Sequence, residues 1–174
     1  MMFFNRFRSV FISTLLVLSS FFIFTSLYDE KSRNITLVEN FAQIEHLFNA
    51  SNDTTYLINF WATTCPPCLK ELPLFEKISD NFVDKKFKLL LINIDDKKRI
   101  DKYVIPFIKK KNIRNDVYSL TDENYNIWTA KVNKEWYGAL PYTVIYKNNT
   151  KKYYFGAFKD LNDIEKEISQ IMTK

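Results

Sequence analysis

Short apolar runs alternate along the chain with stretches whose apolar residues recur at helical spacing, which is the pattern of an α/β protein. The apolar runs predict strands at 35–38, 56–61, 87–94, 117–120, 142–146 and 151–155. The helical spacing predicts helices at 41–49, 69–82, 100–111, 125–132 and 161–172. The run 87–94 does not alternate, which favours a central strand buried on both faces. We therefore expect one sheet with helices packed against it.

The first 28 residues differ from the rest of the chain. Arg6 and Arg8 precede an uncharged run, 9–28, which at helical rise is long enough to cross the roughly 30 Å core of a bilayer. Arginines before such a run favour a cytoplasmic N-terminus and place everything after the run outside the cytoplasm. Because no clear small-residue cleavage site ends the run, we expect an uncleaved signal-anchor at 1–28, with a cleaved signal peptide as the alternative. Residues 29–34 then form a polar linker, and 35–174 form one domain.

The chain carries a formal net charge of +5, with basic clusters at 97–99 and 109–111. Clusters of this kind are usually solvated helix faces. No nucleic-acid-binding motif accompanies them in the sequence, so we expect no nucleic-acid partner. At most, the clusters predict a weak attraction to anionic lipid or to an acidic partner.

The chain has two cysteines, Cys65 and Cys68, which lie between a predicted strand and a predicted helix. At the first turn of a helix, the free backbone N–H groups and the helix dipole stabilise a thiolate. Cys65, at the helix start, is the expected attacking thiolate, and Cys68, one turn along, is expected to resolve the mixed disulfide. Pro66 and Pro67 have no N–H, so the Cys68 N–H is the first donor after Cys65 that can stabilise its thiolate.

Three other uses of the cysteine pair are open at this point. A structural disulfide across so few residues would remove little chain entropy. A structural zinc site needs about four ligands, whereas the chain offers these two cysteines and one histidine, His46. Copper bound by both thiolates and His46 is the third alternative. We expect no resident metal and no cofactor other than a redox-active disulfide between Cys65 and Cys68.

The residues around the cysteines resemble those of a known family. The segment reads Asn59-Phe60-Trp61-Ala62-Thr63-Thr64-Cys65-Pro66-Pro67-Cys68-Leu69-Lys70-Glu71-Leu72-Pro73. It is followed, in order, by Leu140-Pro141 before a predicted strand and by Gly156-Ala157 before the last predicted helix. Together these motifs resemble the TlpA/ResA-like thiol–disulfide oxidoreductases of the thioredoxin superfamily, over most of the chain from residue 35 to residue 172.

The resemblance implies a thioredoxin-like fold, in which helices flank a central mixed sheet, with a TlpA-like helical insertion between 95 and 140. It also implies a cis peptide bond before Pro141, in a loop that faces the dithiol and binds substrate. An ordinary trans proline at the start of a strand is the alternative. Leu140, Trp61 and Thr64 are expected at the substrate-binding rim. Thr64 stands where many relatives have a tryptophan, so the rim differs from theirs.

Glu71 is a further candidate catalytic residue. It lies three residues after Cys68 and so shares its helix face. A partly buried carboxylate there can raise the pKa of the thiol or accept its proton. A solvated glutamate paired with a nearby lysine is the alternative. Asn59 stands where cytosolic thioredoxins have a buried aspartate, which leaves the proton-transfer role to Glu71. Trp128 and Trp136 are expected to be core aromatics.

With the predicted anchor, we expect a membrane-tethered oxidoreductase whose domain faces the periplasm or another extracytoplasmic space. The resemblance implies that it reduces protein disulfides, for example in cytochrome c maturation. The alternatives are a disulfide-forming oxidase and a metal-binding chaperone on the same fold. A chain with one cysteine pair cannot restore its own redox state. We therefore expect protein disulfides or dithiols as substrates, and an external thiol protein as electron donor or acceptor.

Overall fold

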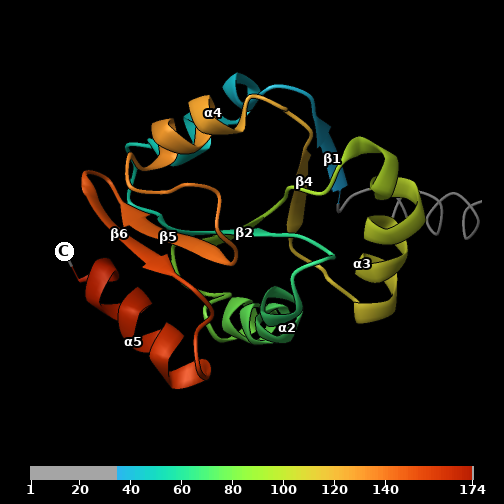
Figure 1. The fold of residues 1–174 in the computed structure, drawn as a ribbon. Coiled ribbons are helices and arrows are strands. Elements are labelled where there is room, and N and C mark those ends of the chain that lie inside the picture. The colour runs from blue at the N-terminus through green and yellow to red at the C-terminus, as the bar shows by residue number, and fades with distance from the viewer. Residues whose placement is uncertain (1–34, 174) are drawn as a thin grey trace, which may run out of the picture. The chain divides into compact units, whose positions relative to one another are not determined.

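The computed structural model describes residues 35–173 of the chain (Figure 1). The predicted signal-anchor at 1–28 and the predicted linker at 29–34 lie outside the described residues. Between residues 35 and 173, no helix is both long enough and apolar enough to cross a membrane.

A six-stranded sheet forms the centre of the described domain (Figure 1). Its strands are β1 (Ile35–Val38), β2 (Thr55–Trp61), β3 (Phe87–Asn93), β4 (Asp116–Leu120), β5 (Tyr142–Lys147) and β6 (Thr150–Phe155). They lie in the order β1-β4-β3-β2-β5-β6. The four strands from β1 to β2 run parallel, whereas β5 and β6 are antiparallel to their neighbours. The predicted mixed sheet is confirmed, with each predicted strand close to its expected bounds.

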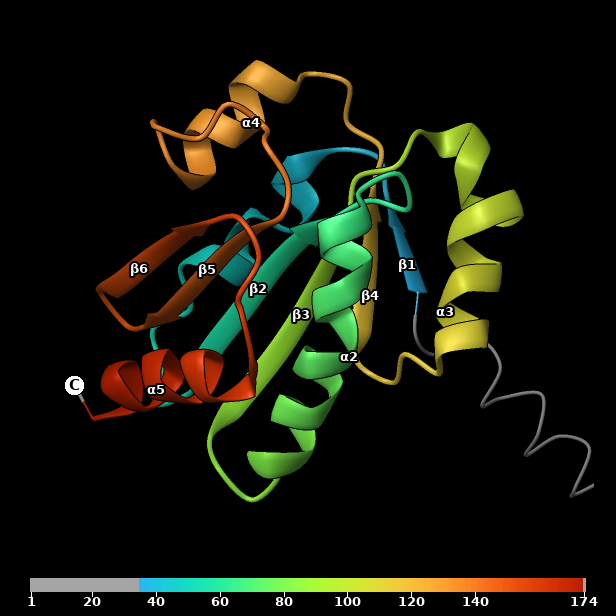
Figure 2. The same ribbon diagram turned by 60° about the horizontal axis from the view of Figure 1, so that its bottom comes forward.

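Helical segments cover both faces of the sheet. The helices α2 (Pro66–Asn81), α3 (Ile105–Lys111) and α5 (Leu161–Met172) pack on one face. The 3-10 turns η1 (Phe41–Gln43) and η2 (Glu45–Phe48) and the helix α4 (Tyr125–Val132) pack on the other. Figure 2 shows α2 and α5 crossing the near side of the sheet, with α4 beyond its upper edge. The arrangement is the predicted three-layer α/β fold.

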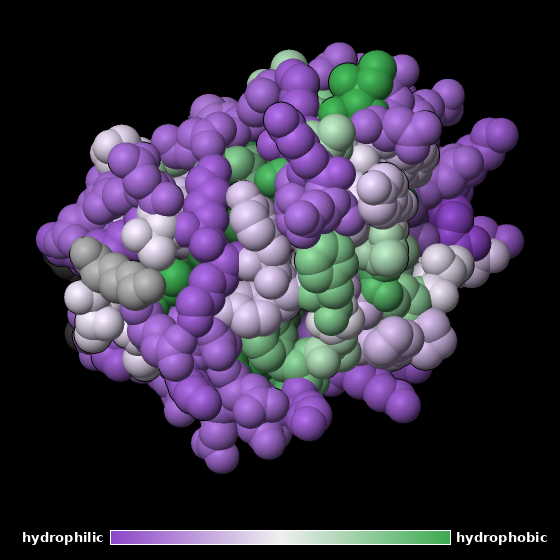
Figure 3. Space-filling view, turned by 60° about the vertical axis from the view of Figure 1, so that its left-hand side comes forward, coloured by the Kyte–Doolittle hydropathy of each residue, from purple (hydrophilic) through white to green (hydrophobic). Residues whose placement is uncertain are grey.

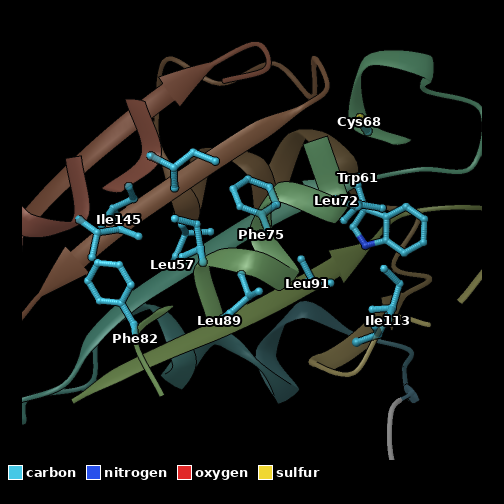
Figure 4. Packing of buried hydrophobic residues seen from close by; sticks show 14 of the residues in the cluster. Leu57, Trp61, Cys68, Leu72, Phe75, Phe82, Leu89, Leu91, Ile113 and Ile145 are labelled. Carbon is cyan, nitrogen blue, oxygen red and sulfur yellow. The ribbon is translucent and has the colours of Figure 1, made fainter. Parts of the chain in front are cut away.

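The central strand β2 is buried along its whole length and contributes side chains to both cores. Leu57 and Trp61 belong to the core under α2 and α5, which Figure 4 shows from close by. Ile58 and Phe60 belong to the core on the opposite face. This alternation follows from the pleat of a strand. Because both faces of β2 are packed, the end of the strand is fixed in position. The loop that carries Cys65 starts from this fixed end.

Segment 41–49 is not the single helix that its apolar spacing predicted. Phe41, Ile44 and Phe48 are buried as a helix would bury them, but the backbone forms the two short turns η1 and η2. Side chains accept hydrogen bonds from the backbone N–H groups at the start of η1. Asp122 accepts the Phe41 N–H, and Gln43 accepts the Asn40 N–H. These hydrogen bonds cap the first turn at its N-terminus, and the regular helix is interrupted at Ile44, whose φ of −116° and ψ of −1° separate η1 from η2.

Segment 97–111 also departs from a plain helix. A 3-10 turn, η3 (Lys97–Arg99), leads into a π-helical turn, η4 (Ile100–Val104), and only then does α3 begin. Pro106 explains the wide turn, because it lacks the N–H that an α-helix would donate to Lys102. The lysines at 109–111 occupy the last turn of α3, where the partial negative charge of the helix C-terminus stabilises cations.

Candidate active site

Cys65 and Cys68 lie at the start of α2. The chain enters this helix after a short turn that follows β2 (Figure 2). Cys65 is the N-cap residue of α2, and the two sulfurs form a disulfide with an S–S distance of 2.00 Å. Cys65 is half-buried, whereas Cys68 has no exposed surface and belongs to the core under α2. A reagent in solvent can therefore reach Cys65 first, as the sequence predicted.

The Cys68 backbone N–H donates to the Cys65 sulfur over 3.3 Å. Pro66 and Pro67 occupy the first two positions of the helix and supply no donor of their own. The hydrogen bond from the Cys68 N–H to Cys65, expected because it is the first donor after Cys65, is thus present. Because both prolines are exposed, they also form part of the surface that surrounds the disulfide.

Glu71 lies one turn after Cys68 and is 1% exposed. One of its carboxylate oxygens accepts the Asn59 side-chain N–H over 2.9 Å, and the other accepts the Phe158 backbone N–H over 3.2 Å. Burial raises the pKa of Glu71 to about 7, although these two hydrogen bonds oppose the shift. Glu71 is therefore not a solvated glutamate paired with a lysine. Near neutral pH it can both hold and release a proton beside the buried Cys68.

The peptide bond between Leu140 and Pro141 is cis, so the trans alternative is wrong. In the β2–β5 pairing Phe60 lies opposite Tyr142, so Pro141 lies beside the C-terminal end of β2. Leu140 and Cys65 pack against the same core. The Pro141 carbonyl accepts the N–H of Gly156 over 3.0 Å. The loop before β5 and the start of α2 therefore meet at one edge of the sheet, with Leu140 half-buried there.

Two predicted rim residues differ in position. Thr64, next to Cys65, is exposed, as expected of a rim residue. Trp61 is fully buried and packs against Phe107 with ring centroids 5.6 Å apart, so its placement at the rim was wrong. Figure 4 shows its indole beneath α2, beside Ile113. As the last residue of a strand buried on both faces, Trp61 has no exposed side to present.

Sequence reasoning missed a polar cluster that holds the loop before Cys65. Asp95, which is 4% exposed, accepts the Thr63 N–H over 2.6 Å and its hydroxyl over 2.7 Å. It also accepts Asn93 Nδ2 over 2.8 Å and Arg99 Nε over 2.9 Å. Burial raises the pKa of Asp95, but these hydrogen bonds outweigh it and the net pKa is lowered. A polar residue directly after the apolar run of β3 was the one sequence signal of this cluster.

His46 lies apart from the cysteines. It is an exposed residue of η2, which packs on the opposite face of the sheet from α2. The structure therefore does not bring His46 together with Cys65 and Cys68. Over residues 35–173, no three His, Cys, Asp or Glu side chains are grouped so that they could hold a metal ion.

The chain belongs to the Redoxin family. The family model matches residues 34–155, which is more than half of the chain. This match, together with the cysteine motif and the fold, confirms the resemblance to the TlpA/ResA-like members of the thioredoxin superfamily.

Individual relatives match over shorter stretches. The chain is 34% identical over 62 residues to thioredoxin of Mycoplasma genitalium, which is 36% of this chain and 57% of that protein. It is 33% identical over 57 residues to sporulation thiol-disulfide oxidoreductase A of Bacillus subtilis, which is 33% of this chain and 34% of that protein. The matches thus span less than two thirds of either relative.

The fold matches solved structures over a longer stretch. A secreted disulfide oxidoreductase of Mycobacterium tuberculosis, described as homologous to Escherichia coli DsbE, superposes with a TM-score of 0.53. The match covers 68% of this chain and 83% of that one, at 17% sequence identity. At this identity the likeness establishes the shared fold.

Proposed function

We propose that this chain is a thiol–disulfide oxidoreductase that exchanges its Cys65–Cys68 disulfide with the disulfides or dithiols of other proteins. The geometry at the start of α2 carries the proposal. An accessible sulfur sits at a helix N-terminus with one backbone N–H donor, and its buried partner lies one turn further along. Family membership supports the same chemistry. No other group is needed for exchange, because the two sulfurs carry the electrons themselves.

In the reducing direction, the Cys65 thiolate attacks one sulfur of a substrate disulfide. That S–S bond breaks, a mixed disulfide forms, and the other substrate sulfur leaves as a thiolate that takes up a proton. Glu71 takes the proton of Cys68, whose thiolate attacks the Cys65 sulfur. The second substrate sulfur leaves, and the Cys65–Cys68 disulfide closes. Two electrons have passed to the substrate, so an external thiol protein must reduce the pair before the next cycle.

We expect the pair to be reducing, with a potential below about −180 mV, nearer to thioredoxin than to DsbA. A strong oxidant needs a stabilised dithiol form. Here Pro66 and Pro67 offer Cys65 no hydrogen bond, and Glu71 adds negative charge beside Cys68 when it ionises. Equilibration with glutathione measures the potential, and reduction of insulin tests the activity. A potential above about −150 mV would instead indicate an oxidase.

The proposal includes a membrane tether and an extracytoplasmic domain. Its support is the uncharged run 9–28 after Arg6 and Arg8, together with the likeness to a secreted disulfide oxidoreductase. Cytochrome c maturation is the process that the TlpA/ResA-like resemblance suggests. The full chain is expected to stay in the membrane fraction after carbonate extraction. A soluble product whose N-terminus lies near Tyr28 or Asp29 would contradict the tether and indicate a cleaved signal peptide.

A further inference from the structure

The segment 137–141, which ends in the cis proline, is bounded by two stacked aromatic residues. Trp136 precedes it and Tyr142 follows it, and their rings lie 4.2 Å apart with an angle of 6° between their planes. Both residues are buried, at 1% and 0% exposure. The segment therefore leaves and re-enters the core at one point. Gly138 has a φ of +85°, which allows the chain to reverse between them.

Trp136 also reaches into the segment that it precedes. Its indole N–H donates to the Ala139 carbonyl over 2.8 Å. The indole also packs against Phe60 of β2, at a ring-centroid distance of 4.5 Å. The ring is thus fixed by the central strand, and it fixes in turn the direction of one carbonyl in an otherwise exposed turn. Tyr137, in the same turn, is 91% exposed.

A held carbonyl also sets the direction of the next N–H. Ala139 C=O and Leu140 N–H belong to one planar peptide group. This peptide is trans, since the cis bond of the loop is the next one, between Leu140 and Pro141. In a trans peptide the two groups point in opposite directions. Since the Ala139 carbonyl points to the buried indole, the Leu140 N–H points away from it. Within residues 35–173, no hydrogen bond occupies that N–H.

We propose that Trp136 is a positioning residue, which orients the Leu140 N–H so that it can donate to the backbone of an extended substrate segment bound beside Cys65. The inference rests on the proposed disulfide exchange with proteins. An unheld peptide plane would have to be ordered each time a substrate binds, whereas a held one is ordered in advance. Trp136 touches neither sulfur, so its effect falls on substrate binding rather than on the redox chemistry.

Trp136→Phe tests the proposal, because it keeps an aromatic ring and removes the indole N–H. Trp128→Phe is the matched control: Trp128 is also 1% exposed, and its indole N–H donates to a backbone carbonyl outside the loop, that of Asp122, over 3.1 Å. In the full chain in detergent, we expect Trp136→Phe to raise the KM for insulin about fivefold, as the loss of one hydrogen bond predicts, with a smaller effect on kcat. The potential of the pair should stay at the wild-type value in both variants.

The outcomes separate this inference from the proposed function. If the wild-type chain does not exchange disulfides with insulin, the proposed function fails, and the inference fails with it. If the wild type is active and both tryptophan variants have the same KM, the inference alone is overturned. Measuring the unfolding midpoint of both variants shows whether a rise in KM reflects lost stability, because Trp128→Phe should lower the midpoint by a similar amount without raising KM.

A measurement that keeps all three tryptophans gives an independent answer if Trp136→Phe does not fold. The chain has three tryptophans, so an ¹⁵N spectrum has three indole N–H signals to assign. A mixed disulfide between a substrate peptide and the Cys68→Ser variant places the peptide beside the loop. We expect the Trp136 signal to shift on trapping while the Trp128 signal stays in place. A Trp136 signal that does not move would overturn the inference.

Discussion

Replacing Cys65 with serine is expected to lower disulfide exchange by about a thousandfold or more, because it removes the attacking sulfur. Replacing Cys68 with serine is expected to leave the first attack in place but to stop the reaction at the mixed disulfide. The reason is the difference in access: Cys65 is half-buried at the N-cap of α2, whereas Cys68 has no exposed surface. The two variants should thus fail at different steps.

Non-reducing gels and alkylation provide the measurements. Cys68→Ser should accumulate a species larger by the mass of one substrate, which a reductant releases, and Cys65→Ser should not. In the reduced wild-type chain, an alkylating reagent should label Cys65 before Cys68. Faster labelling of Cys68, or trapped substrate on Cys65→Ser, would reverse the roles assigned to the two sulfurs.

Replacing Glu71 with glutamine is expected to change how the stability of the oxidised protein depends on pH. In the folded protein the pKa of Glu71 is raised from 4.5 to about 7, mainly by burial. Below pH 4.5 the carboxyl is protonated in both the folded and the unfolded chain, so it has no pH-dependent effect. Between pH 4.5 and about 7, the unfolded chain gives up the proton while the folded chain keeps it. Stability therefore falls as the pH rises through this window, by roughly 3 kcal/mol in total.

Urea unfolding of the oxidised protein between pH 4 and 8 measures this effect. The free energy of unfolding of the wild type should fall relative to that of Glu71→Gln as the pH rises, and the difference should level off above pH 7. Glu76→Gln is the control, since Glu76 lies on the same helix but pairs with Arg114 across 3.4 Å instead. Parallel curves for the wild type and Glu71→Gln would show that Glu71 is not held protonated in the folded state.

The same variant tests the catalytic role of Glu71. If Glu71 takes the proton of Cys68, the step that closes the Cys65–Cys68 disulfide should show an inflection near pH 7 in the wild type. Glu71→Gln should lose this inflection and close the disulfide more slowly at neutral pH. The pH dependence of the first attack, by Cys65, should change much less, because Cys65 takes its stabilisation from the N–H of Cys68.

Local patterns in the chain were enough to predict the redox chemistry and the order of the elements. The spacing of Cys65 and Cys68 after an apolar strand predicted one sulfur at the helix start and a second one turn along, and the structure has both, with Cys65 half-buried and Cys68 buried. The six strands could be predicted from the sequence, because alternating and continuous apolar runs are local patterns. Glu71 could be named from its position on the helix, since residues three apart share a face, and from Asn59, which stands where cytosolic thioredoxins have a buried aspartate.

The groups that hold the site in place come from segments far apart in the chain, so they could be identified from the fold but not from local patterns. The sequence cannot show that Asp95 holds Thr63, 32 residues away, or that the indole of Trp136 holds the loop before Pro141. Trp61 was misplaced at the rim because its burial depends on α3, which packs over it from a distant part of the chain. The pKa of Glu71 is likewise raised by burial, which the fold imposes, against the opposing effect of the hydrogen bonds from Phe158 and Asn59. Local patterns fix which residues share a strand or a helix face. The burial, the pKa values and the hydrogen bonds at a site depend instead on contacts between segments that are far apart in sequence.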